Sequence, residues 1–128
     1  MLNIALMGAG RIGKMHAKNI ALHPMCNLSY VFDINQEFAS QIAQSTKAKV
    51  AKSPDEAIND NDVDVVFIAS ATPTHVDFII KGAKAGKAIF CEKPIDLNIE
   101  KVDQCYETIK NCDVPIQIGF NRRFDNSH

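Results

Sequence analysis

The chain has 128 residues and a formal net charge of −1, from 14 Lys and Arg against 15 Asp and Glu. This balance excludes a nucleic-acid-binding protein that works through a broad cationic field, and 46% hydrophobic with 23% charged residues is typical of a globular domain. The apolar stretches are short and interrupted by charge, and the N-terminus has no signal-peptide pattern. We therefore expect no membrane span and a cytoplasmic protein.

The first half of the chain alternates short apolar runs with segments of helical periodicity, which is the pattern of a parallel sheet with crossover helices. Strands are predicted over residues 3–7, 28–33 and 48–51. One helix is predicted over residues 12–22, and a second has Phe38 and Ile42 on its inner face. A third begins at Ser53, where a capping residue is followed by proline and an acid.

The second half of the chain repeats this alternation. Strands are predicted over residues 63–69, 88–91 and 116–120, the first of them central because it is the most apolar. Thr74 is predicted to cap a helix that runs to Ala85 and stops at Gly86. Asn98 caps a last helix, whose apolar stripe is predicted to be Ile99, Val102, Tyr106 and Ile109. The pattern predicts one α/β domain over residues 1–128, a doubly wound parallel sheet of order 3-2-1-4-5-6.

A glycine-rich sequence, G-x-G-x-x-G, leaves the first predicted strand and enters the first predicted helix. Gly8 permits the tight turn, Gly10 lets a pyrophosphate approach the backbone, and Gly13 lets the helix pack close to the strand. The free N–H groups at the helix start, near Arg11 and Ile12, point at anionic oxygens along a favourable dipole. This context favours a dinucleotide site over the alternative, a purely structural turn.

Asp33 ends the second predicted strand, twenty residues after Gly13. A carboxylate at this place accepts both hydroxyls of an adenosine ribose and repels a 2′-phosphate. Since Ile34, Asn35 and Gln36 supply no cation, the sequence favours NAD over NADP. The alternative is that Asp33 only starts a turn with Asn35. A methyltransferase is disfavoured, because a methyl donor has no pyrophosphate for the glycine loop.

Polar segments follow the fourth, fifth and sixth predicted strands, at the edge where this fold binds ligands. They are Ser70-Ala71-Thr72-Pro73-Thr74-His75, Glu92-Lys93-Pro94 and Gly119-Phe120-Asn121-Arg122-Arg123-Phe124-Asp125. No metal site is expected, because His16, His23, His75 and His128 lack metal-ligand spacing. The cysteines are expected to be reduced and buried, because Cys26, Cys91, Cys105 and Cys112 include no C-x-x-C pair.

With the glycine loop, these segments make residues 2–125 resemble the amino-terminal half of the Gfo/Idh/MocA oxidoreductase family. The sequence Glu-Lys-Pro after the fifth strand is specific to that family. Within it, the runs Gly-Arg-Ile-Gly-Lys-Met-His and Gly-Phe-Asn-Arg-Arg-Phe-Asp are most similar to those of inositol 2-dehydrogenases. The resemblance implies a Rossmann fold, NAD as cofactor and a cyclic polyol as substrate.

The resemblance also implies roles for individual residues. The cofactor-binding set would be Gly8, Gly10, Arg11, Ile12, Gly13, Asp33, Ser70, Thr72, His75, Glu92, Lys93 and Arg122. Lys93 would be catalytic, stabilising the developing alkoxide and relaying its proton, and the peptide bond before Pro94 would be cis. We do not assign proton transfer to His75, because a single histidine is more often a capping or core residue.

In the family a second domain follows, which binds the substrate, mediates oligomerisation and supplies an Asp and a His spaced D-x-x-x-H. The final residues, Asp125-Asn126-Ser127-His128, have the wrong spacing for that motif. We therefore expect an isolated cofactor domain that binds dinucleotide but turns over little inositol. Its surface near Phe120 and Phe124 is expected to be exposed and to favour self-association.

Two alternative functions remain at this stage. One is a dehydrogenase of the same family that acts on scyllo-inositol or another sugar. The other is a dinucleotide sensor without catalysis. Lys93 argues against the sensor, which needs the glycine loop and Asp33 but has no use for a lysine at the hydride-transfer edge.

Overall fold

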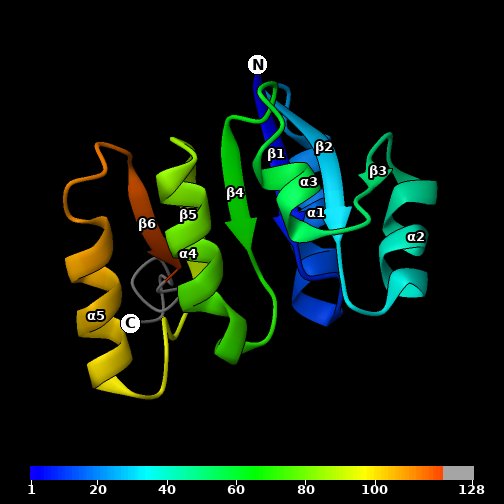
Figure 1. The fold of residues 1–128 in the computed structure, drawn as a ribbon. Coiled ribbons are helices and arrows are strands. Elements are labelled where there is room, and N and C mark those ends of the chain that lie inside the picture. Colours follow the sequence, from blue (N-terminus) through cyan, green and yellow to red (C-terminus); the bar gives the residue numbers. More distant parts are fainter. Residues whose placement is uncertain (120–128) are drawn as a thin grey trace, which may run out of the picture.

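The computed structural model describes residues 1–119, which form a six-stranded sheet between two layers of helices (Figure 1). Its strands are β1 (Leu2–Met7), β2 (Cys26–Phe32), β3 (Lys49–Val50), β4 (Val65–Ile68), β5 (Ala88–Glu92) and β6 (Ile116–Gly119). They lie in the order β3-β2-β1-β4-β5-β6, and every neighbouring pair is parallel. The predicted fold and strand order are confirmed. Successive strands are added to one side of β1 and then, from β4 on, to the other side, and the switch point between β1 and β4 is where such sheets bind ligands.

The helices are α1 (Arg11–Leu22), α2 (Gln36–Ser45), α3 (Pro54–Ile58), α4 (His75–Lys84) and α5 (Ile99–Ile109), with a 3-10 turn, η1 (Thr72–Thr74), before α4. Two predicted caps are confirmed: Ser53 accepts a hydrogen bond from the N–H of Glu56, and Asn98 accepts one from the N–H of Glu100. Gly86, with a φ of +78°, follows the C-cap residue of α4 and ends the helix, as predicted. None of the helices described combines the length and hydrophobicity needed to span a bilayer.

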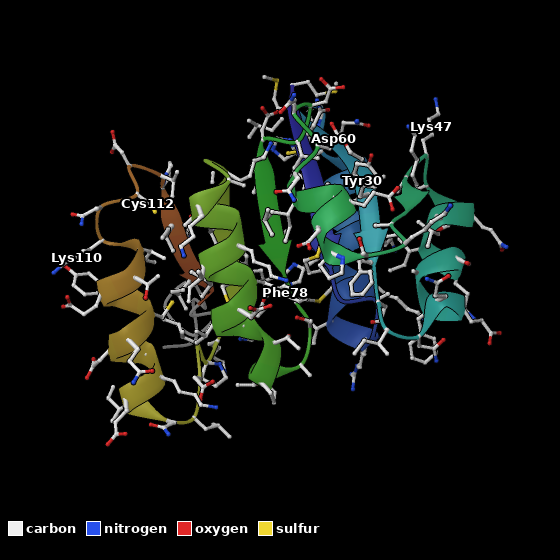
Figure 2. The ribbon with its side chains drawn as sticks, in the orientation of Figure 1. Tyr30, Lys47, Asp60, Phe78, Lys110 and Cys112 are labelled. Atoms are coloured by element: carbon white, nitrogen blue, oxygen red, sulfur yellow. The ribbon has the colours of Figure 1, made fainter. Side chains whose placement is uncertain are left out.

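Two apolar clusters hold the helices on opposite faces of the sheet. The α1 and α2 side chains Ala17, Ile20, Ala39 and Ile42 pack on one face. The other face is covered by α3, α4 and α5, and Phe78 extends from α4 towards the sheet (Figure 2). Since β4 lies between β1 and β5, its Val66 and Ile68 are fully buried, as the apolar run predicted.

Two predicted helix faces were partly wrong. Phe38 is 40% exposed, with the Lys14 ammonium 5.4 Å from its ring centre. The buried face of α2 runs through Ala39 and Ile42, which turns Phe38 to the edge. On α5 the predicted stripe member Tyr106 is 64% exposed, because the buried face runs through Cys105 to Ile109. Ile99, in the first turn of α5, is also exposed.

The predicted cap at Thr74 was also wrong. The Thr74 side chain makes no capping hydrogen bond to α4. Its hydroxyl donates instead to the carbonyl oxygen of Ala71, 2.6 Å away, and lies 2.6 Å from the Ser70 hydroxyl. A threonine that hydrogen-bonds backwards stabilises a turn rather than a helix start, and η1 occupies this place.

The pairing of β1 with β2 contains a β-bulge. Ile4 pairs with Leu28, but Ala5 pairs with Tyr30, so Ser29 is passed over in the register. Beyond the bulge the pairing is regular as far as Met7 and Phe32. This places the residue after β2 level with the glycine loop.

A polar network links β2 to the segments that precede β4 and β5. The Tyr30 hydroxyl donates to Oδ2 of Asp60 at 2.6 Å, and the two side chains lie close together in Figure 2. The hydrogen bond to Asp60, with burial, raises the pKa of Tyr30 to about 12. The Lys87 ammonium, largely buried, donates to the carbonyl oxygens of Asp60 and Val63, both at 2.7 Å. These bonds fix the α3–β4 loop.

Candidate functional site

The glycine loop connects β1 to α1 at the switch point, and its glycines differ in what they do. Gly8 has a φ of +108°, and a Cβ there would lie 2.6 Å from backbone atoms of Ala69 and Ser70. A Cβ on Gly13 would meet the carbonyl oxygen of Gly8. The fold itself therefore requires glycine at both positions. At Gly10 a Cβ would have no neighbour within 4 Å, so the open space beside its backbone leaves room for a ligand.

The start of α1 adds a favourable electrostatic environment to this open space. Gly10 is the N-cap residue and offers no side chain to the helix. The first N–H groups of a helix, here those of Arg11 and Ile12, have no partner within the helix and carry its positive dipole end. The first turn contains no acidic side chain that would occupy them. This helix start can therefore bind an anionic group such as a pyrophosphate.

Asp33 lies directly after β2 and contacts the glycine loop. Its Oδ2 accepts a hydrogen bond of 2.7 Å from the N–H of Ala9, and its Oδ1 accepts one of 2.8 Å from the N–H of Asn35. The turn with Asn35, considered above as an alternative, is thus present together with the contact to the loop. An ionised carboxylate has about four acceptor positions, so two positions remain for the hydroxyls of a ribose.

A cavity of about 220 Å³ lies between these elements. Its walls come from the glycine loop, the end of β2 and the segment after β4, and they are formed by Gly8, Gly10, Phe32, Asp33, Ile34, Ala69, Ser70, Ala71, Thr74 and Phe78. The cavity brings together four of the predicted site residues: Gly8, Gly10 and Asp33 on one side, and Ser70 on the other. Thr72 lies half-buried in η1, outside the cavity lining.

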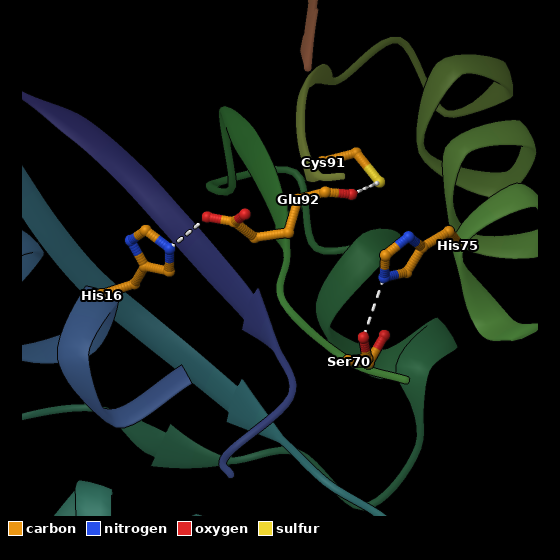
Figure 3. A network of polar contacts seen from close by, with 5 residues as sticks. All are labelled: His16, Ser70, His75, Cys91 and Glu92. Atoms are coloured by element: carbon orange, nitrogen blue, oxygen red, sulfur yellow. Dashed lines mark hydrogen bonds and ion pairs between the residues drawn. The ribbon is translucent and has the colours of Figure 1, made fainter. Parts of the chain in front are cut away.

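His75 is not among the residues that line this cavity. Its side chain is 2% exposed. Nε2 lies 2.8 Å from the carbonyl oxygen of Ser70 (Figure 3), and Nδ1 lies 2.7 Å from that of Pro94. Neither ring nitrogen is left to meet a ligand. His75 therefore connects the segment after β4 with the segment after β5.

Glu92 and Lys93 follow at the carboxyl end of β5. One carboxylate oxygen of Glu92 lies 2.6 Å from Nε2 of His16 on α1 (Figure 3). The His16 ring packs on Phe67 of β4, 4.6 Å between ring centres. Lys93 is exposed, and its peptide bond to Pro94 is cis, as the family resemblance implied.

The contact between His16 and Glu92 was not predicted from the sequence. The available signal was that His16 stands three residues after Gly13. That spacing places it on the same side of α1 as Gly13, facing the sheet. Arg122, the last predicted site residue, lies outside the described residues, as do Phe120, Phe124 and the terminal Asp125-Asn126-Ser127-His128.

Comparison with known proteins identifies what this arrangement is similar to. Residues 2–120 match the model of the GFO_IDH_MocA group, described as an oxidoreductase family with an NAD-binding Rossmann fold. An inositol 2-dehydrogenase of Rhizobium meliloti is 42% identical over 124 residues, and an NAD(+)-dependent scyllo-inositol 2-dehydrogenase of Bacillus subtilis is 41% identical over 123. These matches cover 97% and 94% of this chain, but 37% and 36% of the relatives.

A solved structure shows the same similarity in three dimensions. The crystal structure of a myo-inositol dehydrogenase from Corynebacterium glutamicum superposes with a TM-score of 0.93 at 46% sequence identity. The match covers 99% of this chain and 38% of the other. The chain thus spans little more than a third of the length of the proteins it resembles.

Proposed function

Because the chain belongs to the Gfo/Idh/MocA oxidoreductase family, which has an NAD-binding Rossmann fold, we propose that it is the cofactor-binding part of an NAD-dependent polyol dehydrogenase. The reaction is oxidation of a ring alcohol to a ketone. NAD, when bound, accepts the hydride from the alcohol carbon, and the hydroxyl proton leaves to a base. The proposed substrate is inositol, with myo-inositol preferred.

The hydrogen bond between Ala9 and Asp33 is the observation that carries this proposal. It fixes an anionic acceptor for ribose hydroxyls beside a loop that is open to phosphate at Gly10. The two halves of an adenosine diphosphate need such neighbouring sites. The Asp33 carboxylate would repel a 2′-phosphate, and its next neighbour, Ile34, is an exposed apolar residue rather than a cation, so NAD is preferred to NADP.

Lys93 would act on the reacting alcohol. It is exposed at the carboxyl end of the strand next to β4, where the nicotinamide half would extend from the switch point. An ammonium beside the hydroxyl stabilises the alkoxide that develops as the hydride leaves, and can relay the proton. Ser70, Thr72 and Glu92 would border the same half of the cofactor, Ser70 from the cavity wall.

The names of the relatives support inositol as the substrate class. Relatives and neighbours of similar identity are named as acting on myo-inositol or on scyllo-inositol, which differ in the configuration of one ring hydroxyl. A non-catalytic dinucleotide sensor is the second candidate. The presence of Lys93 at the hydride-transfer edge favours the dehydrogenase over the sensor.

Titration calorimetry of the chain with NAD and with NADP tests the cofactor. We expect NAD to bind and NADP to bind more weakly, and equal or stronger NADP binding would contradict the role of Asp33. Formation of NADH, followed by absorbance with myo-inositol and scyllo-inositol in separate reactions, tests the substrate. If NAD binds but neither polyol yields NADH even when a substrate-binding domain is supplied, the sensor is favoured.

A further inference from the structure

His75 is a buried histidine whose two hydrogen-bond partners are both backbone carbonyl oxygens. Nδ1 lies 2.7 Å from the carbonyl oxygen of Pro94, and Nε2 lies 2.8 Å from that of Ser70. A carbonyl oxygen carries no hydrogen and can only accept. Each ring nitrogen must therefore donate if both contacts are hydrogen bonds.

A neutral imidazole has one N–H and one bare nitrogen, so it can make only one of these two bonds. With a neutral ring, the other contact would place a nitrogen lone pair against an oxygen lone pair at hydrogen-bond distance. The imidazolium has two N–H groups and satisfies both carbonyl oxygens. We propose that His75 is held as an imidazolium and is a positioning residue for Lys93, clamping the segment after β5 to the segment after β4.

Among residues 1–119, the ring of His75 has no hydrogen-bond partner besides these two carbonyl oxygens. Asp96, in the segment after β5, accepts a hydrogen bond from the N–H of Asn98. On β5 the ionisable side chains are Cys91, whose pKa burial raises to about 12, and Glu92, which contacts His16. The elements η1 and β4 contain no ionisable side chain. The ionisable residues of α5 are Glu100, Lys101, Asp103, Cys105, Tyr106 and Glu107, of which Cys105 is buried, and burial raises its pKa.

On α4 itself the charged side chains are Asp77, Lys81 and Lys84, and Asp77 contacts Lys81. His75 is the first residue of α4, where the helix dipole disfavours a cation. The two carbonyl oxygens are therefore the groups that stabilise the charge, through charge-assisted hydrogen bonds.

The clamp acts on Lys93 through the backbone, and this part of the inference rests on the proposed function. Pro94 directly follows Lys93, so fixing the Pro94 carbonyl restricts where the Lys93 side chain can begin. The Ser70 carbonyl belongs to a residue that lines the cavity beside the glycine loop. The clamp thus sets the distance between the two halves of the proposed cofactor site.

Nuclear magnetic resonance of the histidine rings tests the protonation state in the unliganded chain. At about pH 8, above the usual imidazole pKa of about 6.5, we expect both ring nitrogens of His75 to carry a proton. The exposed His23 provides the reference in the same spectrum. A single protonated nitrogen on His75 would overturn the proposal. This readout does not depend on NAD binding, so it remains decisive if the proposed function fails.

Two substitutions test the positioning role. The variant His75→Gln keeps one N–H donor for one carbonyl, whereas His75→Phe keeps none. We expect NAD affinity to fall several-fold in the order wild type, His75→Gln, His75→Phe. ADP affinity should stay unchanged, because the glycine loop and Asp33, which are proposed to bind ADP, have no hydrogen bond to His75. Equal losses for NAD and ADP, or no loss, would overturn the positioning role. The matched control, His23→Gln, should leave both affinities unchanged.

Discussion

The backbone N–H of Ala9 donates a hydrogen bond of 2.7 Å to the carboxylate of Asp33, which joins the glycine loop to the end of β2. The two residues are 24 positions apart in the chain. The glycine loop and the carboxylate proposed to receive the ribose are therefore fixed relative to one another before any ligand binds. Such preorganisation lowers the entropic cost of binding.

Replacement of Asp33 by alanine should weaken NAD binding by about tenfold or more, because charge-assisted hydrogen bonds contribute about 1.5–3 kcal/mol each. The variant Asp33→Asn keeps an acceptor for Ala9 but loses the charge, so NADP should gain relative to NAD. Calorimetry with both dinucleotides measures the change in preference. The exposed Asp103 on α5 provides the control, Asp103→Ala, whose preference should match the wild type. An unchanged preference in Asp33→Asn would contradict the electrostatic argument.

Substitution of two glycines of the loop should affect different quantities: Gly10→Ala the affinity for NAD, and Gly8→Ala the free energy of unfolding. Gly10→Ala adds a methyl group where no atom lies within 4 Å, so its free energy of unfolding should stay within about 0.5 kcal/mol of the wild type while NAD affinity falls. Gly8→Ala places a side chain at a φ of +108° against backbone atoms and should lose about 1–3 kcal/mol of stability. Chemical denaturation and calorimetry measure the two quantities, and a destabilised Gly10→Ala would refute this division of roles.

The pKa of Tyr30, raised to about 12 from 10.0, predicts a dependence of stability on alkaline pH. The folded protein binds the phenol proton more tightly than the unfolded chain does, so this stabilisation is complete below pH 10 and is lost as the pH rises from 10 to 12. Denaturation across this range should show the loss in wild type. It should disappear in Tyr30→Phe but persist in Tyr106→Phe, which removes an exposed hydroxyl from α5.

The cysteines should differ in their reactivity with an alkylating agent. All four are free; Cys91 and Cys105 are buried as predicted, whereas Cys26 and Cys112 are only half-buried, which corrects the expectation for that pair. Burial raises the pKa of the Cys91 thiol to about 12, and the thiolate is the reactive form. Mass spectrometry should find Cys26 and Cys112 modified first in the folded chain, and all four modified after denaturation. Early modification of Cys91 would mean that this part of the core opens readily.

The features that could be predicted from sequence are those that depend on residues close together in the chain. The order of the strands follows from the apolar runs, and the glycine loop is recognisable because it joins a strand to a helix. The caps at Ser53 and Asn98 each involve residues two or three positions apart. The place of Asp33 at the end of the second strand was predicted, but its hydrogen bond with Ala9 was not, because it depends on the register shift between β1 and β2.

The features that were missed depend on which groups meet across the fold. His16 and Glu92 are 76 positions apart, and no local pattern links them. His75 was predicted to border the cofactor, but it is buried and both of its ring nitrogens contact backbone carbonyl oxygens, which every residue has and no sequence pattern marks. The turn at Thr74 and the exposed edge at Phe38 were missed because one helical turn allows several neighbouring faces, and tertiary packing chooses among them.

Ser29, the residue passed over between β1 and β2, sets the register of Asp33 against the glycine loop. Side chains along a strand alternate between the two sides of the sheet. Deleting Ser29 would draw Asp33 back by one position, level with Met7, and would turn its carboxylate to the opposite side. The length of a seven-residue strand, rather than the acid alone, thus decides whether Asp33 can receive a ribose.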